Sequence, residues 1–287
     1  MKKILIIGGN ASIAKNLIDK LLQQNEYEIH TLQRVQVQNS KNIYHHQTDY
    51  KNIDQYKELI QESDYIFYCI GITNGTEKEI QSINIELFDR FLKYFKQPTK
   101  IIFMSSASPM YNNNSYAKSK LYAEEKLKDS NLNFIALRPS VMYGPYDRNN
   151  LVKISNFIKK LPLIPVVAPK HKIQPVFMPD IADLILTAIT ENKFTNREYI
   201  ISGPKQFDMY KLFTLLKMKF KLKRPLIPVP LILVQTVVRF LNIFIPAKYL
   251  LAYQVLNIKI HPPFDSSDAI KDFNFKQTPF EVGILKD

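Results

Sequence analysis

Short runs of apolar residues alternate with helical patterns along the first half of the chain. The first run is followed by Leu17, Ile18, Leu21 and Leu22, which recur at the spacing of one helix face. The runs lie at 3–7, 27–32, 64–71, 101–107 and 134–139. Uninterrupted apolar strands separated by helices are typical of a parallel sheet that is covered on both faces. The pattern predicts an α/β fold with a doubly wound, Rossmann-like parallel sheet.

The turn after the first run consists of small residues, from Gly8 to Ala14. A strand, such a turn and a helix form a dinucleotide-binding unit, because the backbone must approach the pyrophosphate and the helix offers it N–H groups. Gly8 keeps its glycine, but Ala11 stands at the second small position and is expected to weaken or reposition the dinucleotide. An ordinary turn is the alternative. The predicted cofactor contacts here are Gly8, Asn10, Ala11, Ser12 and Ile13.

The end of the second run favours one cofactor. Dinucleotide-binding domains carry an acidic residue here for the ribose 2′-hydroxyl, whereas arginine accommodates a 2′-phosphate. This chain has Gln33-Arg34, so Arg34 favours NADP(H) over NAD(H). A solvated arginine in a very basic chain is the alternative.

Two later strand ends also face the expected cofactor site. Asp49-Tyr50 stands where a third strand gives way to a helix, so Asp49 either caps that helix or contacts the adenine. The fourth strand ends in Cys69-Ile70-Gly71. Gly71 either lets a ribose approach the backbone or simply turns the chain.

The segment 105–120 carries candidate chemistry. Tyr116 and Lys120 lie on one face of a predicted helix, one turn apart. A nearby ammonium favours phenolate, so Lys120 is expected to lower the pKa of Tyr116 from about 10. Ser106 ends the run 101–107, at the strand edge where ligands of such sheets bind. Tyr-x-x-x-Lys alone is weak evidence, but on this scaffold it predicts catalysis by Ser106, Tyr116 and Lys120.

In this order the motifs resemble those of extended or atypical short-chain dehydrogenases/reductases of the NAD-dependent epimerase/dehydratase type. The resemblance covers nearly all of the chain, through 8–14, 49, 69–71, 83–84, 105–107, 116–120, 138–145 and 174–182. It implies that Tyr116 is the general acid/base, that Lys120 also holds the nicotinamide ribose, and that Ser106 binds the reacting oxygen. It further implies that Pro139 and Ser140 lie beside the nicotinamide.

The resemblance implies an NAD(P)-dependent oxidoreductase or epimerase acting on a sugar nucleotide or a related carbonyl or alcohol. Val141 departs from it, because nucleotide-sugar epimerases have an asparagine there that touches the substrate. The short linker between Ser106 and Tyr116 suggests a more open substrate side. The stretch 138–141 is similar instead to an atypical branch that includes the NADPH-binding accessory subunit of respiratory complex I. The second hypothesis is therefore a non-catalytic NADP(H)-binding accessory or assembly protein of a membrane complex.

Length and composition bound the organisation of this chain of 287 residues. We expect a dinucleotide-binding domain at 1–145 and a smaller substrate-binding lobe over most of 146–287, interleaved with the sheet. Proline clusters at 162–165 and 225–230 mark loops at its borders. The single cysteine, Cys69, cannot form an internal disulfide, which fits a reducing, cytoplasmic compartment. The dispersed histidines indicate no metal site.

The formal net charge is +13, and its sharpest local source is 217–224, where basic and apolar residues alternate. The alternation suits a half-buried strand with one cationic face. Three roles are open: a lysine-guarded sheet edge, which we favour, attraction to anionic lipid, or nucleic acid. Nothing here resembles a nucleic-acid-binding module. The apolar stretch 231–245 is too short to cross a bilayer and is expected to be a buried helix of the lobe, with an interfacial helix as the alternative. Peripheral membrane contact through 217–245 follows from the lipid alternative.

Overall fold

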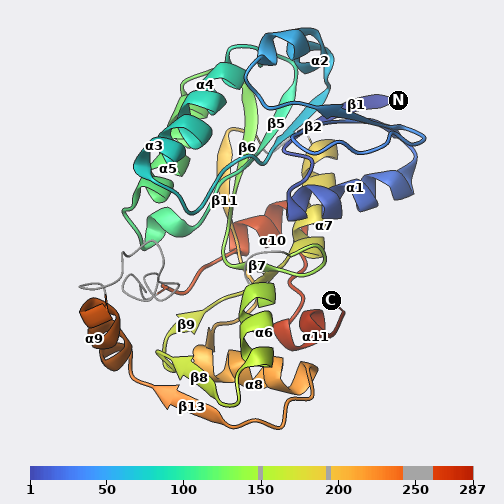
Figure 1. Ribbon diagram of the computed structural model, residues 1–287. Helices are drawn as coiled ribbons and strands as arrows, with labels where there is room; N and C mark the ends of the chain where they lie inside the picture. The colour runs from blue at the N-terminus through green and yellow to red at the C-terminus, as the bar shows by residue number, and fades with distance from the viewer. Residues whose placement is uncertain (148–150, 192–194, 242–260, 287) are drawn as a thin grey trace.

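A seven-stranded parallel sheet forms the centre of the molecule (Figure 1). The computed structural model describes all residues except 148–150, 192–194, 242–260 and 287. Among the described residues the strand order is β11-β6-β5-β4-β1-β2-β3. The strands are β1 Lys2–Ile7, β2 Tyr27–Gln33, β3 Ile43–Gln47, β4 Tyr65–Tyr68, β5 Lys100–Met104, β6 Asn133–Pro139 and β11 Arg197–Ile201. The predicted fold class is confirmed.

Helices cover both faces of this sheet because its strands are apolar on both sides. Ile4 and Ile6 of β1 pack toward α1 (Ser12–Gln24), α7 (Met178–Thr190) and α10 (Ser267–Phe273). Leu5 and Ile7 pack on the opposite face, toward α2 (Lys57–Glu62), α4 (Leu87–Leu92) and α5 (Ser115–Lys128). All four β1 side chains are fully buried. We call the sheet and these helices the sheet domain.

The strand order reverses beside β1, which lies between β2 and β4. The chain runs outward to β3 and then returns to form β4 on the other side of β1. Ligands of open α/β sheets bind outside the carboxyl ends of the strands at such a switch point. The reversal brings residues 8–14 beside residues 69–71, as Cys69 N donates to Ile7 O at 3.0 Å.

Shorter elements form a small lobe below the sheet domain in Figure 1. Its helices are α6 Leu151–Lys160, α8 Met209–Lys219, α9 Leu231–Leu241 and α11 Phe280–Lys286. Its strands pair in twos: β7 Met142–Tyr143 with β10 Val176–Phe177, β9 Lys172–Ile173 with β12 Phe207–Asp208, and β8 Ile164–Val167 with β13 Leu226–Val229. A separate apolar cluster around Tyr143, Leu212 and Phe280 fills the lobe. Because β11 lies in the sheet, the chain beyond residue 145 contributes to both parts, and the domain limits stay a prediction.

The predicted strand at 217–224 is wrong. Residues up to Lys219 belong to α8. The helix begins at Asp208, whose carboxylate accepts a hydrogen bond from Lys211 N at 2.7 Å. It buries Leu212, Phe213 and Leu216, which lie three and four residues apart. The helical spacing of these buried residues, and not the alternation at 217–224, determines the secondary structure here. Lysine, methionine and leucine are also good helix formers.

The stretch 231–245 is helical over α9, and residues 242–245 lie outside the described residues. The expectation that this helix is buried is wrong at its start, because Ile232 is 69% and Leu233 is 56% exposed. None of the described helices is long and apolar enough to cross a bilayer.

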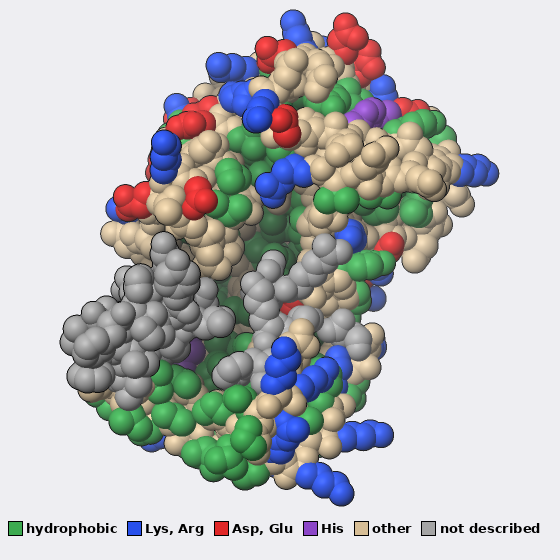
Figure 2. All heavy atoms as spheres, in the orientation of Figure 1, with side chains coloured by type: hydrophobic (Ala, Val, Ile, Leu, Met, Phe, Trp, Pro, Cys, Tyr) green, Lys and Arg blue, Asp and Glu red, His purple; other side chains and the backbone are tan. Residues whose placement is uncertain are grey.

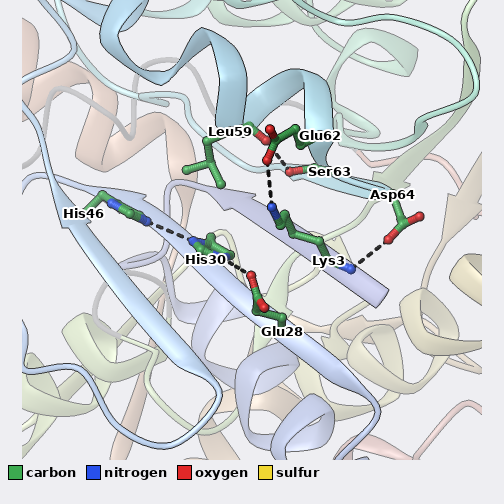
Figure 3. A network of polar contacts seen from close by, with 8 residues as sticks. All are labelled: Lys3, Glu28, His30, His46, Leu59, Glu62, Ser63 and Asp64. Atoms are coloured by element: carbon green, nitrogen blue, oxygen red, sulfur yellow. Dashed lines mark hydrogen bonds and ion pairs between the residues drawn. The ribbon is translucent and has the colours of Figure 1, made fainter. Parts of the chain in front are cut away.

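Histidines join the two outer strands of the sheet (Figure 3). His30 of β2 lies between two partners, with Nδ1 3.0 Å from His46 Nε2 and Nε2 2.7 Å from Glu28 Oε1. On the neighbouring β1, Lys3 pairs with Glu62 at 2.9 Å. The described part of the chain contains no group of His, Cys, Asp and Glu arranged to hold a metal ion. His30 and His46 link the neighbouring strands β2 and β3 at one edge of the sheet.

Candidate functional site

Two glycines shape the turn after β1. Gly8 has φ +103°, a conformation that side chains disfavour, and a Cβ there would lie 3.1 Å from Cys69 Sγ. A Cβ at Gly9 would lie 2.6 Å from the Cβ of Thr31. The two glycines therefore let this turn pack closely against β2 and the residues after β4. Gly9 was not among the predicted site residues, although the glycine pair directly after a strand is its signal.

The predicted contacts after these glycines differ in how much of each residue is exposed. Ala11 begins α1 with extended backbone, and no side chain caps the helix there. The first N–H groups of α1 therefore remain suited to an anion. Ser12 Oγ donates to Tyr146 O at 2.7 Å, and Ile13 is buried in the core. Asn10 is half-buried in the turn. The backbone of this turn, rather than its side chains, can hold a pyrophosphate.

Arg34 lies at the exposed end of β2. Its backbone carbonyl accepts from Gln47 Nε2 at 3.4 Å. Gln33, before it, is buried, and its amide donates to Val35 O at 3.0 Å. Within the described ranges no carboxylate forms an ion pair with the Arg34 guanidinium. The guanidinium is therefore accessible to an anion at the edge of the site.

The helix-cap interpretation of Asp49 is wrong. Asp49 Oδ1 accepts from Lys51 N at 2.9 Å, so the carboxylate closes its own turn. The following helical turn, Ile53–Tyr56, begins at Asn52. Tyr50 has φ 64° and is buried, with its hydroxyl donating to Leu32 O at 3.0 Å. Tyr50 thereby fixes this loop against the end of β2.

The residues after β4 lie against the catalytic candidates. Cys69 Sγ lies 3.3 Å from Ile7 O, and burial raises the pKa of its thiol to about 12, which makes it unreactive. Ile70 is half-buried. A Cβ at Gly71 would lie 3.2 Å from Lys120 Nζ and 3.5 Å from Asn84 Oδ1. Glycine thus keeps the backbone open directly above the lysine.

Asn84 holds the loop after β4 against α5. Its Oδ1 accepts from Ile72 N at 2.8 Å, and its Nδ2 donates to Ile72 O and to Ser119 Oγ, both at 3.0 Å. Asn84 lies in the π-helical stretch Gln81–Glu86, which continues the short helix α3 (Glu77–Ile80) into α4. π-Helical turns are frequent at functional sites.

Ser106 and Tyr116 lie together at the carboxyl edge of the sheet. Ser106 follows β5, and its Oγ accepts from Ser108 N at 3.0 Å in the turn Ser108–Met110. Tyr116 stands in the first turn of α5, which Asn114 caps by accepting from Ala117 N at 2.9 Å. Burial raises the pKa of Tyr116, and a hydrogen bond with the Ser106 side chain opposes that rise.

Lys120 is directed toward the end of β5. Its Nζ donates to Met104 O at 2.9 Å and lies 5.0 Å from the centre of the Phe103 ring. Burial lowers the pKa of Lys120 to about 8. The expectation that Lys120 lowers the pKa of Tyr116 is wrong in this structure, because the effect of burial dominates the tyrosine and the ammonium is bonded to the strand end.

A buried ion pair positions the helix that carries both residues. Glu124 of α5 is 1% exposed. Its carboxylate accepts a hydrogen bond from the Ser105 hydroxyl and forms an ion pair with Arg138 of β6. Pro139 O accepts from Ala107 N at 3.0 Å, and Ser140 N donates to Ile201 O at 2.9 Å. Pro139 and Ser140 therefore lie at the same sheet edge as Ser106.

An aromatic cluster missed by the sequence interpretation joins the sheet domain to the small lobe. The ring of Tyr111, which follows Ser108–Met110, lies 4.2 Å from that of His261. His171 lies 5.2 Å from His261 on the other side of the junction. The buried Nδ1 of His261 has no hydrogen-bond partner among the described residues. Burial, reinforced by His171, lowers the pKa of His261 to about 4.

The model of the NAD dependent epimerase/dehydratase family matches residues 4–202. The chain belongs to this family. The match confirms the family that the motifs resembled and the expected class of NAD-dependent enzyme. It covers the strand ends, the glycine turn and the catalytic candidates described above.

Two curated relatives are distant. NADH dehydrogenase (ubiquinone) 1 alpha subcomplex subunit 9, mitochondrial, of Dictyostelium discoideum is 24% identical over 163 residues, 55% of this chain and 45% of that protein. The chain thus spans less than half the length of this relative. UDP-glucose 4-epimerase of Vibrio cholerae is 21% identical over 237 residues, 70% of each chain.

Solved structures share the fold over nearly the whole chain. UDP-glucuronic acid 4-epimerase from Bacillus cereus, in complex with UDP-glucuronic acid and NAD, matches with a TM-score of 0.78 and 16% identity, over 98% of this chain and 96% of that one. UDP-N-acetylglucosamine 4-epimerase from Methanobrevibacter ruminantium M1 matches with a TM-score of 0.79 and 15% identity, over 99% and 96%.

Proposed function

We propose that the protein is an NAD(P)-dependent epimerase or oxidoreductase of nucleotide sugars, with Tyr116 as its general acid/base. The observation that carries the proposal is the cluster at the sheet edge. Ser106 lies close enough to Tyr116 to lower the pKa of its hydroxyl, and Lys120 is buried one turn further along α5, next to Gly71. A tyrosine, a hydroxyl donor and a cation at one strand edge are suited to proton transfer at a substrate hydroxyl.

The residues around the turn fit a dinucleotide. A side chain at Gly8, Gly9 or Gly71 would meet atoms of neighbouring segments within 3.2 Å, so glycine lets the strand ends around the expected cofactor site lie close together. The uncapped start of α1 suits its pyrophosphate. A bound nicotinamide would supply the acceptor and donor for the hydride that leaves a substrate carbon and returns to it. The similar epimerase from Bacillus cereus was solved in complex with NAD, whereas Arg34 keeps NADP(H) as our predicted preference.

The three residues divide the proton chemistry among them. Tyr116 takes the proton of the substrate hydroxyl as that carbon is oxidised, and returns it on reduction. Ser106 donates a hydrogen bond to the same oxygen. Lys120 keeps most of its positive charge at neutral pH, since its pKa is about 8. As the family resemblance implies, Lys120 would hold the ribose of the bound nicotinamide.

Replacing Tyr116 tests the assignment. Tyr116→Phe should lower turnover at least about 100-fold, the effect of a lost general acid/base, and leave the dinucleotide dissociation constant nearly unchanged. Tyr122→Phe is the matched control, because Tyr122 lies on the same helix and its hydroxyl donates to Asp89 at 2.8 Å. Turnover would be assayed with UDP-glucose, UDP-glucuronic acid and UDP-N-acetylglucosamine. Full activity of Tyr116→Phe on any substrate that the unmutated protein converts would exclude Tyr116.

One comparison supports a second candidate, a non-catalytic dinucleotide-binding accessory protein. The relative from Dictyostelium discoideum carries the name of an NADH dehydrogenase subunit, and Val141 replaces the asparagine expected for nucleotide-sugar epimerases. Such a protein would retain dinucleotide without turnover and remain in a larger complex after mild purification. Particle size, partner content and released cofactor distinguish the candidates. A lone protein that converts a nucleotide sugar excludes the accessory role.

A further inference from the structure

The paired strands β8 and β13 present an apolar face to the outside of the small lobe. Ile164 and Val166 of β8 are fully buried, so Pro165 and Val167 point the other way. The parallel register sets Ile227 beside Pro165 and Val229 beside Val167. Leu163, just before β8, is 53% exposed and Ile227 is 42% exposed. The outer side of this ribbon is therefore entirely aliphatic.

The apolar surface continues into α9. Leu233 N donates to Pro230 O at 3.1 Å, so the helix begins directly after β13. Ile232 and Leu233 are the exposed residues of its first turn. We call Leu163, Ile227, Ile232 and Leu233, with the outer side of the ribbon, the apolar patch.

Basic residues border the apolar patch. Lys159 and Lys160 end α6 just before β8, and 217–224 leads into β13. Arg224 joins the two segments by donating to Lys159 O at 2.7 Å and Leu161 O at 2.6 Å. In Figure 2 hydrophobic side chains gather at the lower end of the lobe, with Lys and Arg beside them.

The charge of this border is not neutralised by nearby acids. In sequence, 151–172 contains no Asp or Glu, and Asp208 is the only acidic residue of 205–224. Across the described residues, no ion pair involves Lys160, Lys221 or Lys223. Lys159 and Lys219 also line a pocket of about 240 Å³ beside Phe220. At Lys160, Lys221 and Lys223 the border therefore offers positive charge that no ion pair among the described residues neutralises, beside a recess of about 240 Å³.

We infer that the apolar patch and its basic border dock the protein on a membrane surface rich in anionic phospholipid. Aliphatic side chains enter the boundary of the acyl chains, while the lysines lie against lipid phosphates. Two such signals together give stable attachment where either alone is weak. Single-stranded nucleic acid would instead require aromatic rings for base stacking, and the patch is aliphatic.

Tryptophan fluorescence tests insertion directly, because the chain contains no Trp. Ile232→Trp places a single reporter on the patch, and Leu22→Trp places one on α1 of the sheet domain, where Leu22 is 38% exposed. With vesicles of equal parts phosphatidylglycerol and phosphatidylcholine, the emission of Ile232→Trp should shift to the blue and be quenched by brominated lipid. Leu22→Trp should show neither effect. An unshifted Ile232→Trp spectrum overturns the proposal.

Sedimentation with the same vesicles tests the charge. Replacing Lys160, Lys221 and Lys223 together by Gln should weaken binding at low salt at least about tenfold, because each lysine contributes up to about 1 kcal/mol near an anionic surface. The matched control replaces Lys41, Lys57 and Lys96, all exposed in the sheet domain, with the same change in net charge. Unmutated protein should not sediment with pure phosphatidylcholine.

Three results would contradict the proposal. Equal loss of vesicle binding in both triple variants would mean that net charge alone, and not this surface, attracts the protein. Failure of the unmutated protein to sediment with anionic vesicles would exclude the membrane. Binding to a DNA oligonucleotide that depends on the same lysines, without vesicle binding, would assign the surface to nucleic acid. None of these residues belongs to the proposed catalytic site, so dinucleotide binding should stay unchanged in every variant.

Discussion

Two sets of lysines, one in each part of the molecule, occupy opposite environments. In the sheet domain Lys120 is 6% exposed and donates to a backbone carbonyl at the end of β5. In the small lobe Lys160, Lys221 and Lys223 are exposed, and so are Ile232 and Leu233. The sheet domain thus buries a cation among apolar side chains, whereas the lobe presents both kinds of side chain to the outside.

The two environments imply different uses. Burying an ammonium disfavours its charged form, so a buried lysine lowers stability unless a carboxylate compensates it. Such a group is expected at a site where its charge acts on a ligand. An exposed lysine has little effect on folding and remains available to a partner. The comparison assigns the sheet domain to chemistry and the lobe to an external surface.

The largest effect is expected from removing the buried charge. Lys120→Met should abolish most turnover yet raise the free energy of unfolding at neutral pH. A pKa lowered from 10.5 to about 8 corresponds to roughly 3 kcal/mol of destabilisation below pH 8. Loss of the hydrogen bond to Met104 O offsets about 1 kcal/mol of the gain. Urea unfolding should therefore show a net stabilisation of about 2 kcal/mol.

The pH dependence of stability distinguishes removal of a buried charge from better packing as the cause of the stabilisation by Lys120→Met. The folded-state pKa of Lys120 lies below its unfolded value, so the unfavourable charge is fully present below about pH 8. It disappears as the pH rises toward 10.5, and the advantage of Lys120→Met should disappear with it. Lys221→Met, at an exposed position of the lobe, should change stability by less than about 0.5 kcal/mol. A stabilisation by Lys120→Met that does not vary with pH would mean that better packing, and not the buried charge, causes it.

The sheet domain was more predictable from sequence than the lobe, for physical reasons. Strands such as 3–7 and 101–107 are buried on both faces, and only an apolar run satisfies that environment. The lobe is built from strands of two to four residues, too short to show a period. At 217–224 the alternation of lysine with apolar residues matched a strand, but the spacing of Leu212, Phe213 and Leu216 and the cap at Asp208 extend a helix to Lys219.

The candidate site was predictable where it follows a strand end and unpredictable where it depends on contacts across the fold. Gly71 follows β4, Ser106 follows β5, and Tyr116 stands at the start of α5. Tyr111 and His261 meet only because the end of the chain returns to the sheet domain. Whether the pKa of Tyr116 is raised or lowered depends on how deeply the side chain is buried, which local sequence does not specify.

The edge of the sheet domain provides the next test of exposed charge. If Arg34 pairs with a 2′-phosphate, NADPH should bind at least about tenfold tighter than NADH, since a charge-assisted hydrogen bond contributes roughly 1.5–3 kcal/mol. Arg34→Ala should remove most of this preference without weakening NADH. Lys57→Ala, at an exposed lysine of α2, is the control. Equal affinities for NADPH and NADH in the unmutated protein would mean that Arg34 is a solvated surface charge with no role in cofactor choice. That result would agree with the NAD complex among the similar structures.

The last test concerns the junction of the two parts, where His261 packs between Tyr111 and His171. The pKa of His261 is lowered to about 4, so the folded protein favours the neutral ring. This contribution to stability is present above the unfolded pKa of about 6.5 and is lost as the pH falls toward 4. Lowering the pH below about 6.5 should therefore weaken the contact between the sheet domain and the lobe.

His261→Phe keeps a flat ring against Tyr111 and removes both the titration and the unpartnered Nδ1. Between pH 6.5 and 4, the slope of unfolding free energy against pH should fall by up to about one proton, or roughly 1.4 kcal/mol per pH unit. His46→Phe is a useful comparison, because burial lowers the pKa of His46 as well but at the sheet edge, away from the junction. If only His46→Phe reduced the slope of unfolding free energy against pH, the acid sensitivity would arise at the sheet edge. A smaller slope in His261→Phe would place it where the sheet domain and the lobe meet.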